Sequence, residues 1–151
     1  MKFCIQLVDF SEKFLELSFL WLSDSEINRL TNTGLITRES QKKWFASLSN
    51  RIDYKVWGVC YDEIPIGVCG LKHIQQNCAE YFGYIGDKSK WGGTGTVMMQ
   101  CVEQKALELG IDRLILRVLS INNRAIALYK KMGYVEVSFD GEFYTYQKNI
   151  H

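Results

Sequence analysis

A glycine-rich run at residues 90–96, Lys-Trp-Gly-Gly-Thr-Gly-Thr, is the part of the chain whose composition points most directly to chemistry. An amphipathic segment follows it, and we expect a helix over residues 96–109. Glycines at the entrance to a helix let the backbone approach a ligand closely. The free amides and the dipole of a helix N-terminus favour a phosphate group. The run therefore predicts an anion-binding site, although a plain tight turn before a helix would have a similar composition.

A second motif follows a β-rich run at residues 113–118. It reads Asn122-x-x-Ala125-Ile126-x-Leu128-Tyr129-x-Lys131-x-Gly133-Tyr134. Together with Lys90-x-x-Gly93-x-Gly95, this motif resembles the acetyl-CoA site of the GCN5-related N-acetyltransferases, the GNAT superfamily. The resemblance covers the second half of the chain closely and the first half loosely. The chain departs from the family at Lys90, where Gln or Arg is usual, and at Trp91, where Gly is frequent.

The resemblance implies acetyl-CoA as cosubstrate and a set of residues that would bind it. The backbone amides of the glycine-rich run would hold the pyrophosphate, the pantetheine arm would pair with a strand ending near residue 85, and an amide at or near Ile85 would polarise the acetyl carbonyl. The expected cofactor-binding residues are Tyr84, Ile85, Lys90, Gly92, Gly93, Thr94, Gly95, Thr96, Asn122 and Tyr129.

Two catalytic residues are expected from the same resemblance. Tyr129 stands where the family often carries a general acid, a phenol that protonates the departing thiolate. The pKa of a phenol, about 10, is close enough to the pKa of a thiol, about 8.5, for the proton to be transferred. Glu80 stands where some members carry a base for the attacking amine. Tyr129 could instead be an aromatic wall of the core, and Glu80 a solvated strand-edge charge. Weaker candidates for the base are Asp24, Asp53, His73 and Tyr81.

The acceptor should bind to the N-terminal helices and loops, between residues 21 and 44. This segment resembles enzymes that acetylate nucleotide-linked amino-deoxysugars, as in pseudaminic-acid and O-antigen biosynthesis, and also enzymes that acetylate ribosomal-protein N-termini. The segment has no acidic cluster for a polycationic acceptor, and we favour the amino sugar. A non-catalytic acetyl-CoA sensor is a third hypothesis, because Trp91 intrudes on the phosphate loop. The expected acceptor-binding residues are Trp21, Asn28, Trp44 and Tyr81.

The composition sets the remaining limits. The chain has 151 residues, is 47% hydrophobic and contains one Pro, which predicts a single folded domain over residues 1–151. A net charge of +1 gives no general attraction to nucleic acid or membranes. The N-terminus does not resemble a signal peptide, so we expect a cytoplasmic protein, and the sequence allows a homodimer. Five Cys and two His show no metal-ligand spacing, so we expect no metal, and an odd number of Cys without an export signal favours reduced thiols.

The expected order of strands and helices predicts one α/β (α+β) domain on a mixed, mostly antiparallel sheet of about seven strands, flanked by about four helices. The resemblance implies that this domain has the GNAT fold, with a splayed V-shaped slot for acetyl-CoA. The expected strands are residues 3–8, 54–61, 64–71, 79–85, 113–119, 135–139 and 143–148. Helices are expected after Ser11, after Thr37, and over residues 96–109 and 123–131, with a short helical turn near residues 24–30. Asp140-Gly141 predicts a type I′ turn between the last two strands.

Overall fold

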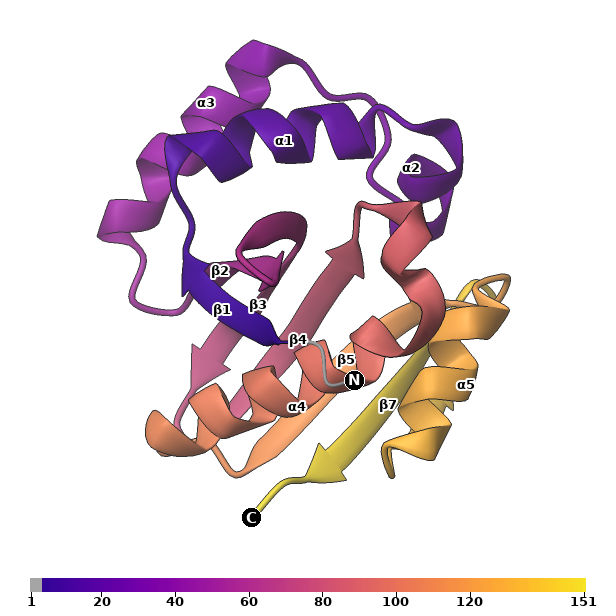
Figure 1. The fold of residues 1–151 in the computed structure, drawn as a ribbon. Helices are drawn as coiled ribbons and strands as arrows, with labels where there is room; N and C mark the ends of the chain where they lie inside the picture. Colours follow the sequence, from indigo (N-terminus) through magenta and orange to yellow (C-terminus); the bar gives the residue numbers. More distant parts are fainter. Residues whose placement is uncertain (1–3) are drawn as a thin grey trace.

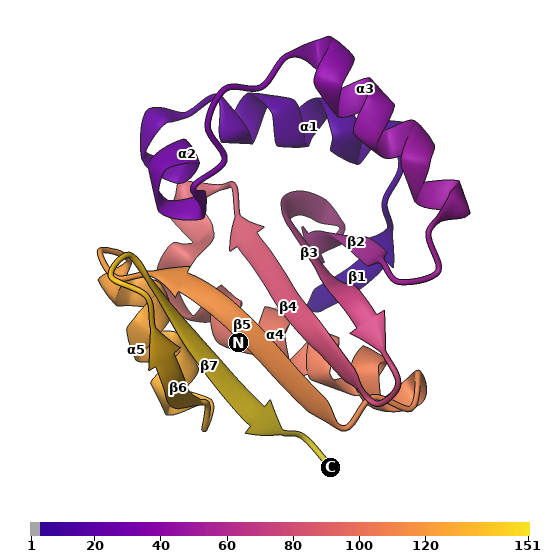
Figure 2. The ribbon, with the colours of Figure 1, turned by 180° about the vertical axis from the view of Figure 1, so that it is seen from behind.

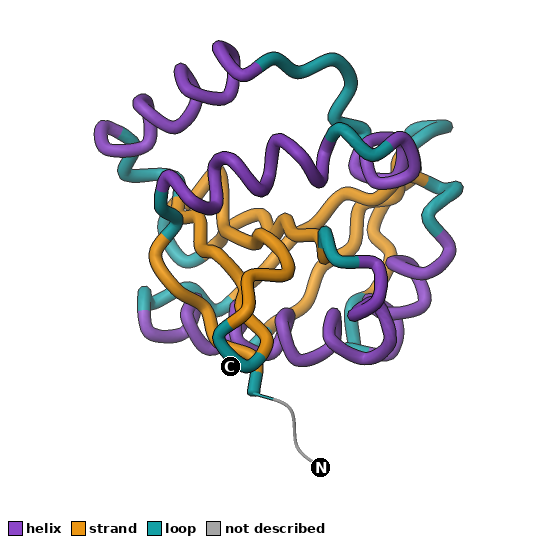
Figure 3. Tube along the Cα trace, turned by 45° about the horizontal axis from the view of Figure 1, so that its top comes forward, coloured by secondary structure: helices purple, strands orange, loops and turns teal. Residues whose placement is uncertain are grey.

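The computed structural model describes residues 4–151 as one seven-stranded sheet between two groups of helices (Figures 1 and 3). The strands are β1 (Ile5–Asp9), β2 (Lys55–Tyr61), β3 (Ile64–Gln75), β4 (Cys78–Ile85), β5 (Arg113–Leu119), β6 (Val135–Phe139) and β7 (Phe143–Asn149). The helices are α1 (Glu12–Leu22), α2 (Ser25–Thr31), α3 (Arg38–Ser47), α4 (Trp91–Glu108) and α5 (Asn123–Lys131). The strand order is β1-β2-β3-β4-β5-β7-β6, and every neighbouring pair is antiparallel except β4 and β5. The predicted fold class is confirmed, with five helices where about four were expected.

The parallel pair β4 and β5 is joined over only three residues of each strand. Cys78 to Glu80 pair with Arg113 to Ile115, and beyond that point the two strands have no common register. Figure 2 shows β4 and β5 separating from this junction. The resulting gap in the sheet is the predicted V-shaped slot.

The alternation of side chains along β4 divides the molecule into two sides. Tyr81 and Ile85 belong to the main hydrophobic core, together with Met98 of α4. Phe82 and Tyr84 point to the opposite face. The Tyr84 ring lies 6.4 Å from that of Trp21 on α1, and the Phe82 ring lies 5.4 Å from that of Tyr54, just before β2. One face of β4 therefore meets α4, and the other faces the N-terminal helices.

Local signals placed most helix ends correctly. Thr37 begins α3 with a capping box to Ser40, and α5 has the predicted bounds, with Gly133 just beyond it at φ 93°. Ser11 is the N-cap of α1, but its side chain makes no capping hydrogen bond. The expected helical turn near residue 25 is a full helix, α2, because Asp24 accepts hydrogen bonds from the Glu26 and Ile27 amides.

The expected type I′ turn at Asp140-Gly141 is wrong, although the hairpin forms. Only Gly141 has a positive φ, of 100°, whereas a type I′ turn needs two consecutive positive values. The Asp140 carboxylate instead accepts the Glu142 and Phe143 amides and closes a longer loop. Two consecutive positive φ values, 47° and 70°, occur at Asp62 and Glu63 in the β2–β3 hairpin.

Three further expectations concern the chain as a whole. Phe3, predicted to begin the first strand, lies outside the described residues. The five cysteines are free, with Cys60 and Cys69 buried and Cys4 exposed. Between residues 4 and 151, no helix is both long and apolar enough to cross a bilayer, and no cluster of His, Cys, Asp or Glu could hold a metal ion.

Candidate active site

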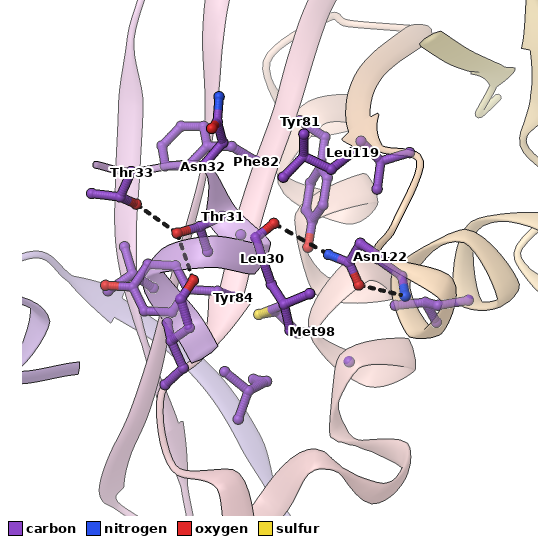
Figure 4. A pocket seen from close by; sticks show the side chains of 18 of the residues that line it. Leu30, Thr31, Asn32, Thr33, Tyr81, Phe82, Tyr84, Met98, Leu119 and Asn122 are labelled. Atoms are coloured by element: carbon purple, nitrogen blue, oxygen red, sulfur yellow. Dashed lines mark hydrogen bonds between the residues drawn. The ribbon is translucent and has the colours of Figure 1, made fainter. Parts of the chain in front are cut away.

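A cavity of about 890 Å³ occupies the gap between β4 and β5 and continues beneath the N-terminal helices (Figure 4). Its walls come from both sides of the sheet. The α4–α5 side contributes Trp91, Gly92, Gly93, Gly95, Thr96, Met98, Arg124, Ala125, Leu128 and Tyr129. The opposite side contributes Phe10, Ser40, Gln41, Trp44, Tyr54, Lys72, Glu80, Phe82, Arg117 and Phe143, together with residues of α2. The cavity therefore joins two chambers through the split in the sheet.

The glycine-rich run forms an open turn before the regular part of α4. Gly92 (φ −76°, ψ 101°) and Gly93 (φ 85°, ψ −18°) are not helical, so the regular helix begins after them. A Cβ atom built on either residue would meet nothing within 4 Å. Thr94 is buried, and its hydroxyl donates to the Lys90 carbonyl, which fixes the turn. The turn therefore leaves room for a ligand directly before the first amides of the helix, which have no intrahelical acceptors, as an anion site requires.

Arg124 is the cation beside this turn that lines the cavity, and Lys90 points elsewhere. The Lys90 ammonium lies 4.4 Å from the centre of the Tyr61 ring on β2, and Lys90 does not line the cavity. The Arg124 guanidinium lies 5.0 Å from the Trp91 ring centre and donates to the Trp91 carbonyl at 3.4 Å. Arg124 follows Asn122 closely in the second motif, so the motif itself could have drawn attention to it.

Trp91 closes the end of the free edge of β4. Its indole N–H donates to the Ile85 carbonyl at 2.8 Å, on the edge that β5 has left. The Gly86 amide on the other edge donates to Ile66 of β3 at 2.7 Å, so the peptide between Ile85 and Gly86 is held from both sides. Trp91 therefore supplies the partner that β5 would give in a continuous sheet. The sequence marked Trp91 as a departure from the family and as a residue that would intrude on the phosphate loop, but did not indicate this contact with β4.

Two backbone amides of β4 face the gap. Because successive amides of a strand point to opposite edges, and the Gly86 amide points to β3, those of Gly83 and Ile85 point away from β3. Beyond Glu80 no β5 residue pairs with them. A ligand in the gap can therefore use them as hydrogen-bond donors.

Tyr129 projects from α5 into the cavity wall. It is 8% exposed, and its ring lies 6.3 Å from that of Tyr81 and 6.2 Å from that of Tyr134. Its hydroxyl makes no hydrogen bond with any other residue in the range 4–151. Burial raises the pKa of Tyr129 to about 12, so the phenol keeps its proton at neutral pH.

Glu80 lies where β4 and β5 part, on the chamber beneath the N-terminal helices. Its side chain is 18% exposed, with one carboxylate oxygen 3.0 Å from Nδ1 of His73 and the other 3.6 Å from the Lys72 ammonium. A β-bulge in β3 and a φ of 52° at His73 accompany this arrangement. Of the weaker base candidates, only Tyr81 lines the cavity, and Asp24, Asp53 and His73 do not.

The four expected acceptor-binding residues divide into two pairs. Trp44 and Tyr81 line the cavity, whereas Trp21 and Asn28 do not. Trp21 packs over Gly86 and against Tyr84, whose hydroxyl is buried without a partner. The Asn28 side chain donates to the carbonyls of Leu22 and Gly34 and accepts the Gly34 amide. Asn28 thus fastens the loop after α2, and both of its N–H donors are used there.

Asn122 is the N-cap of α5 and lines the cavity. Its side chain accepts the Ala125 amide at 3.2 Å and donates to the Leu30 carbonyl of α2 at 3.4 Å (Figure 4). It therefore links the two chambers across the gap.

Comparison with known proteins agrees with this geometry. The family model for the acetyltransferase (GNAT) domain matches residues 5–135. The chain belongs to the GNAT family.

Individual GNAT relatives support the assignment at different levels. An uncharacterised N-acetyltransferase of Bacillus subtilis, YdgE, is 34% identical over 62 residues, which are 41% of this chain and only 40% of that protein. The Campylobacter jejuni N-acetyltransferase PseH in complex with acetyl coenzyme A has a TM-score of 0.78 at 24% identity, over 97% of this chain and 99% of PseH. The Vibrio cholerae spermidine N-acetyltransferase with CoA and spermine has a TM-score of 0.87 at 14% identity, over 96% and 95%. At these identities the two solved structures establish the fold.

The GNAT assignment supports acetyl-CoA as cosubstrate, and the turn at Gly92 and Gly93 fits it. The turn is open to a ligand, the helix amides behind it lack intrahelical acceptors, and Arg124 lies beside it. The free edge of β4 offers two further hydrogen-bond donors, the backbone amides of Gly83 and Ile85. The chain therefore has the parts needed to hold a phosphate group and an extended arm that ends at the junction of β4 and β5.

Proposed function

We propose that this GNAT protein transfers the acetyl group of acetyl-CoA to a primary amine of a nucleotide-linked amino sugar. The observation that carries the choice of acceptor is the charge of the cavity. Among the described residues that line it, Glu80 is the one carboxylate. Two cations, Lys72 and Arg117, lie on the side of the N-terminal helices, where Arg117 is also 3.3 Å from Asp140, and two more, Arg124 and Lys131, lie on α5. Glu80 already contacts Lys72 and His73. An anionic acceptor suits this charge, and a polycation such as spermidine does not.

The chamber beneath the N-terminal helices also suits a ring-bearing anion. The Lys72 ammonium lies 5.7 Å from the centre of the Phe82 ring, and the Arg117 guanidinium lies 4.4 Å from that of Phe143. Trp44 and Tyr54, with ring centres 6.2 Å apart, add aromatic surface. Aromatic faces stack on sugars and bases, and an Arg binds phosphate oxygens through two parallel hydrogen bonds.

The chain's own groups can account for both proton transfers. Acetyl-CoA supplies an activated thioester when bound. Glu80, at the junction of β4 and β5, accepts the proton of the attacking amine, directly or through water. Tyr129 donates its proton to the departing sulfur, so the proton lost by nitrogen is balanced by the one gained by the thiol. The amides of Gly83 and Ile85 hold the ligand along the edge of β4.

A panel of acceptors tests the proposal through CoA release. We expect turnover of a UDP- or dTDP-linked amino sugar, and little with spermidine or with a peptide copying a ribosomal-protein N-terminus. Arg117→Leu should raise KM for the nucleotide sugar at least 10-fold. Arg113→Leu is the matched control, because it lies four residues earlier on the same face of β5 and does not line the cavity.

Two outcomes would overturn the proposal. Efficient turnover of the peptide or of spermidine, with none of the nucleotide sugars, would change the acceptor class. Tight acetyl-CoA binding with no turnover of any amine would make the chain a binding protein.

A further inference from the structure

Tyr81 occupies the innermost position of the gap. It follows Glu80, the last residue of β4 that pairs with β5. It is 3% exposed, and Figure 4 shows its hydroxyl directed into the pocket. That hydroxyl makes no hydrogen bond with any other residue between 4 and 151. Among the described residues, only the Tyr84 hydroxyl is fully enclosed without a partner, so the Tyr81 hydroxyl remains accessible from the cavity and can donate to a ligand there.

The Tyr81 hydroxyl lies beside a backbone donor. A Cβ atom built on Gly83 would be 2.7 Å from the Tyr81 oxygen, so the hydroxyl lies directly over the Gly83 backbone. Any side chain at residue 83 would collide with it. The Gly83 amide faces the gap at the same level of β4. A phenol O–H and a peptide N–H therefore lie at the same level of the cavity wall.

The position of Tyr129 indicates that the thioester of acetyl-CoA would lie next to the Tyr81 hydroxyl and the Gly83 amide. Its ring meets that of Tyr81 edge-on, with centres 6.3 Å apart. If Tyr129 protonates the departing sulfur, the thioester lies at the level of Tyr81 and Gly83. The sequence led us to expect that the amide of Ile85 would polarise the acetyl carbonyl. Ile85 lies two residues further along β4, toward Trp91, and its own backbone carbonyl accepts a hydrogen bond from the Trp91 indole.

We propose that Tyr81 is a catalytic residue whose phenol O–H, with the Gly83 amide, donates a hydrogen bond to the acetyl carbonyl oxygen. This inference rests on the proposed acetyl transfer. As the amine nitrogen attacks the carbonyl carbon, the π electrons move to oxygen, where the two donors stabilise the charge. When they return, the C–S bond breaks, Tyr129 gives its proton to sulfur, and Glu80 takes the amine proton. The Tyr81 proton stays on its own oxygen throughout.

The surroundings keep Tyr81 in the donor form. Burial, and to a lesser extent Tyr129, raises the pKa of Tyr81 well above its usual value. The phenol is therefore protonated over the whole range in which the enzyme can be assayed.

Tyr81→Phe tests the inference, because it removes the hydroxyl and keeps the ring. We expect turnover to fall about 10²-fold, at the lower end of the effect of losing one such donor. The melting temperature and the dissociation constant of acetyl-CoA should stay close to those of the wild type. Tyr146→Phe is the matched control, since Tyr146 is a buried core tyrosine of β7 outside the cavity.

Isotope-edited infrared spectroscopy gives a readout that does not depend on turnover. With acetyl-CoA labelled at the carbonyl carbon, the bound carbonyl band should lie at lower frequency than in water. Tyr81→Phe should move it back toward the value in water, and Tyr129→Phe should leave it in place. A band unchanged by Tyr81→Phe, or lost stability with weaker binding of both substrates, would make Tyr81 a packing residue. Failure of the wild type to bind acetyl-CoA would instead refute the proposed function.

Discussion

Tyr129→Phe is the most informative test of the acid assigned to the thiolate, because the structure separates its chemical role from its packing role. The substitution leaves both ring contacts, with Tyr81 and with Tyr134, and removes only a hydroxyl. That hydroxyl has no hydrogen-bond partner among residues 4–151. The free energy of unfolding should therefore change by less than about 1 kcal/mol.

The size of the kinetic effect follows from the pKa of the phenol. Burial raises the pKa of Tyr129 to about 12, whereas an ordinary thiol has a pKa of about 8.5. The difference of roughly 3.5 units corresponds to about 5 kcal/mol against complete transfer to a free thiolate in water. Burial also raises the pKa of the thiol, which narrows the gap. General acids contribute typically 10² to 10⁴, and a weak acid should lie near the lower end, so we expect a fall of about 10²-fold in kcat.

Single-turnover kinetics should be used, because slow product release can hide a slower chemical step. Calorimetry should give the same acetyl-CoA affinity for the variant and the wild type. The two pH–rate profiles should have the same shape up to about pH 10, because the buried phenol does not ionise there. Unchanged single-turnover rates would refute the assignment and make Tyr129 a wall of the cavity. A loss of affinity with intact turnover would make its hydroxyl a cofactor anchor.

Three further predictions follow from the geometry. Gly92→Val should weaken acetyl-CoA binding at least 10-fold by calorimetry without lowering the melting temperature, since nothing in the protein opposes a side chain there, while Lys90→Ala should change it less than twofold. Glu80→Gln should lower kcat/KM for the amine by about 10²-fold or more, and an unchanged value would assign the proton to bulk water. Asn28→Ala should cost about 1–3 kcal/mol in urea unfolding, because three hydrogen bonds are lost, and a folded variant that binds substrates normally would confirm a structural role.

The sequence predicted best where one local rule acts alone. Thr37 and Ser40 form the expected capping box, and Gly133 takes the left-handed conformation that ends α5. The motif starting at Asn122 placed Tyr129 correctly on a helix that faces the cavity. Such features depend on residues a few positions apart, and no distant part of the chain competes with them.

The sequence could not show where a side chain with a choice of partners would lie. A lysine beside the glycine-rich turn suggests a phosphate ligand, but the Lys90 ammonium lies over the ring of Tyr61, a residue of a distant strand. Asn28 and Trp21 were expected to bind the acceptor because their segment resembles two branches of the family. Both are used within the fold, by the loop after α2 and by the packing on Gly86. Spacing cannot reveal these contacts, because they depend on tertiary structure.

The period of two along β4 explains how one strand can serve both substrates. Glu80 and Phe82 face the chamber beneath the N-terminal helices, whereas Tyr81 and Ile85 face α4 and the core. An amine on one face and a thioester on the other can meet only at the edge of the strand, and only where no neighbour covers that edge. The edge of β4 is exposed because β5 no longer pairs with it after residue 115, and the Trp91 indole covers this edge at Ile85. Under the proposed function, we therefore expect the reactive position between the last β4–β5 pair and Trp91, on the short stretch that includes Gly83.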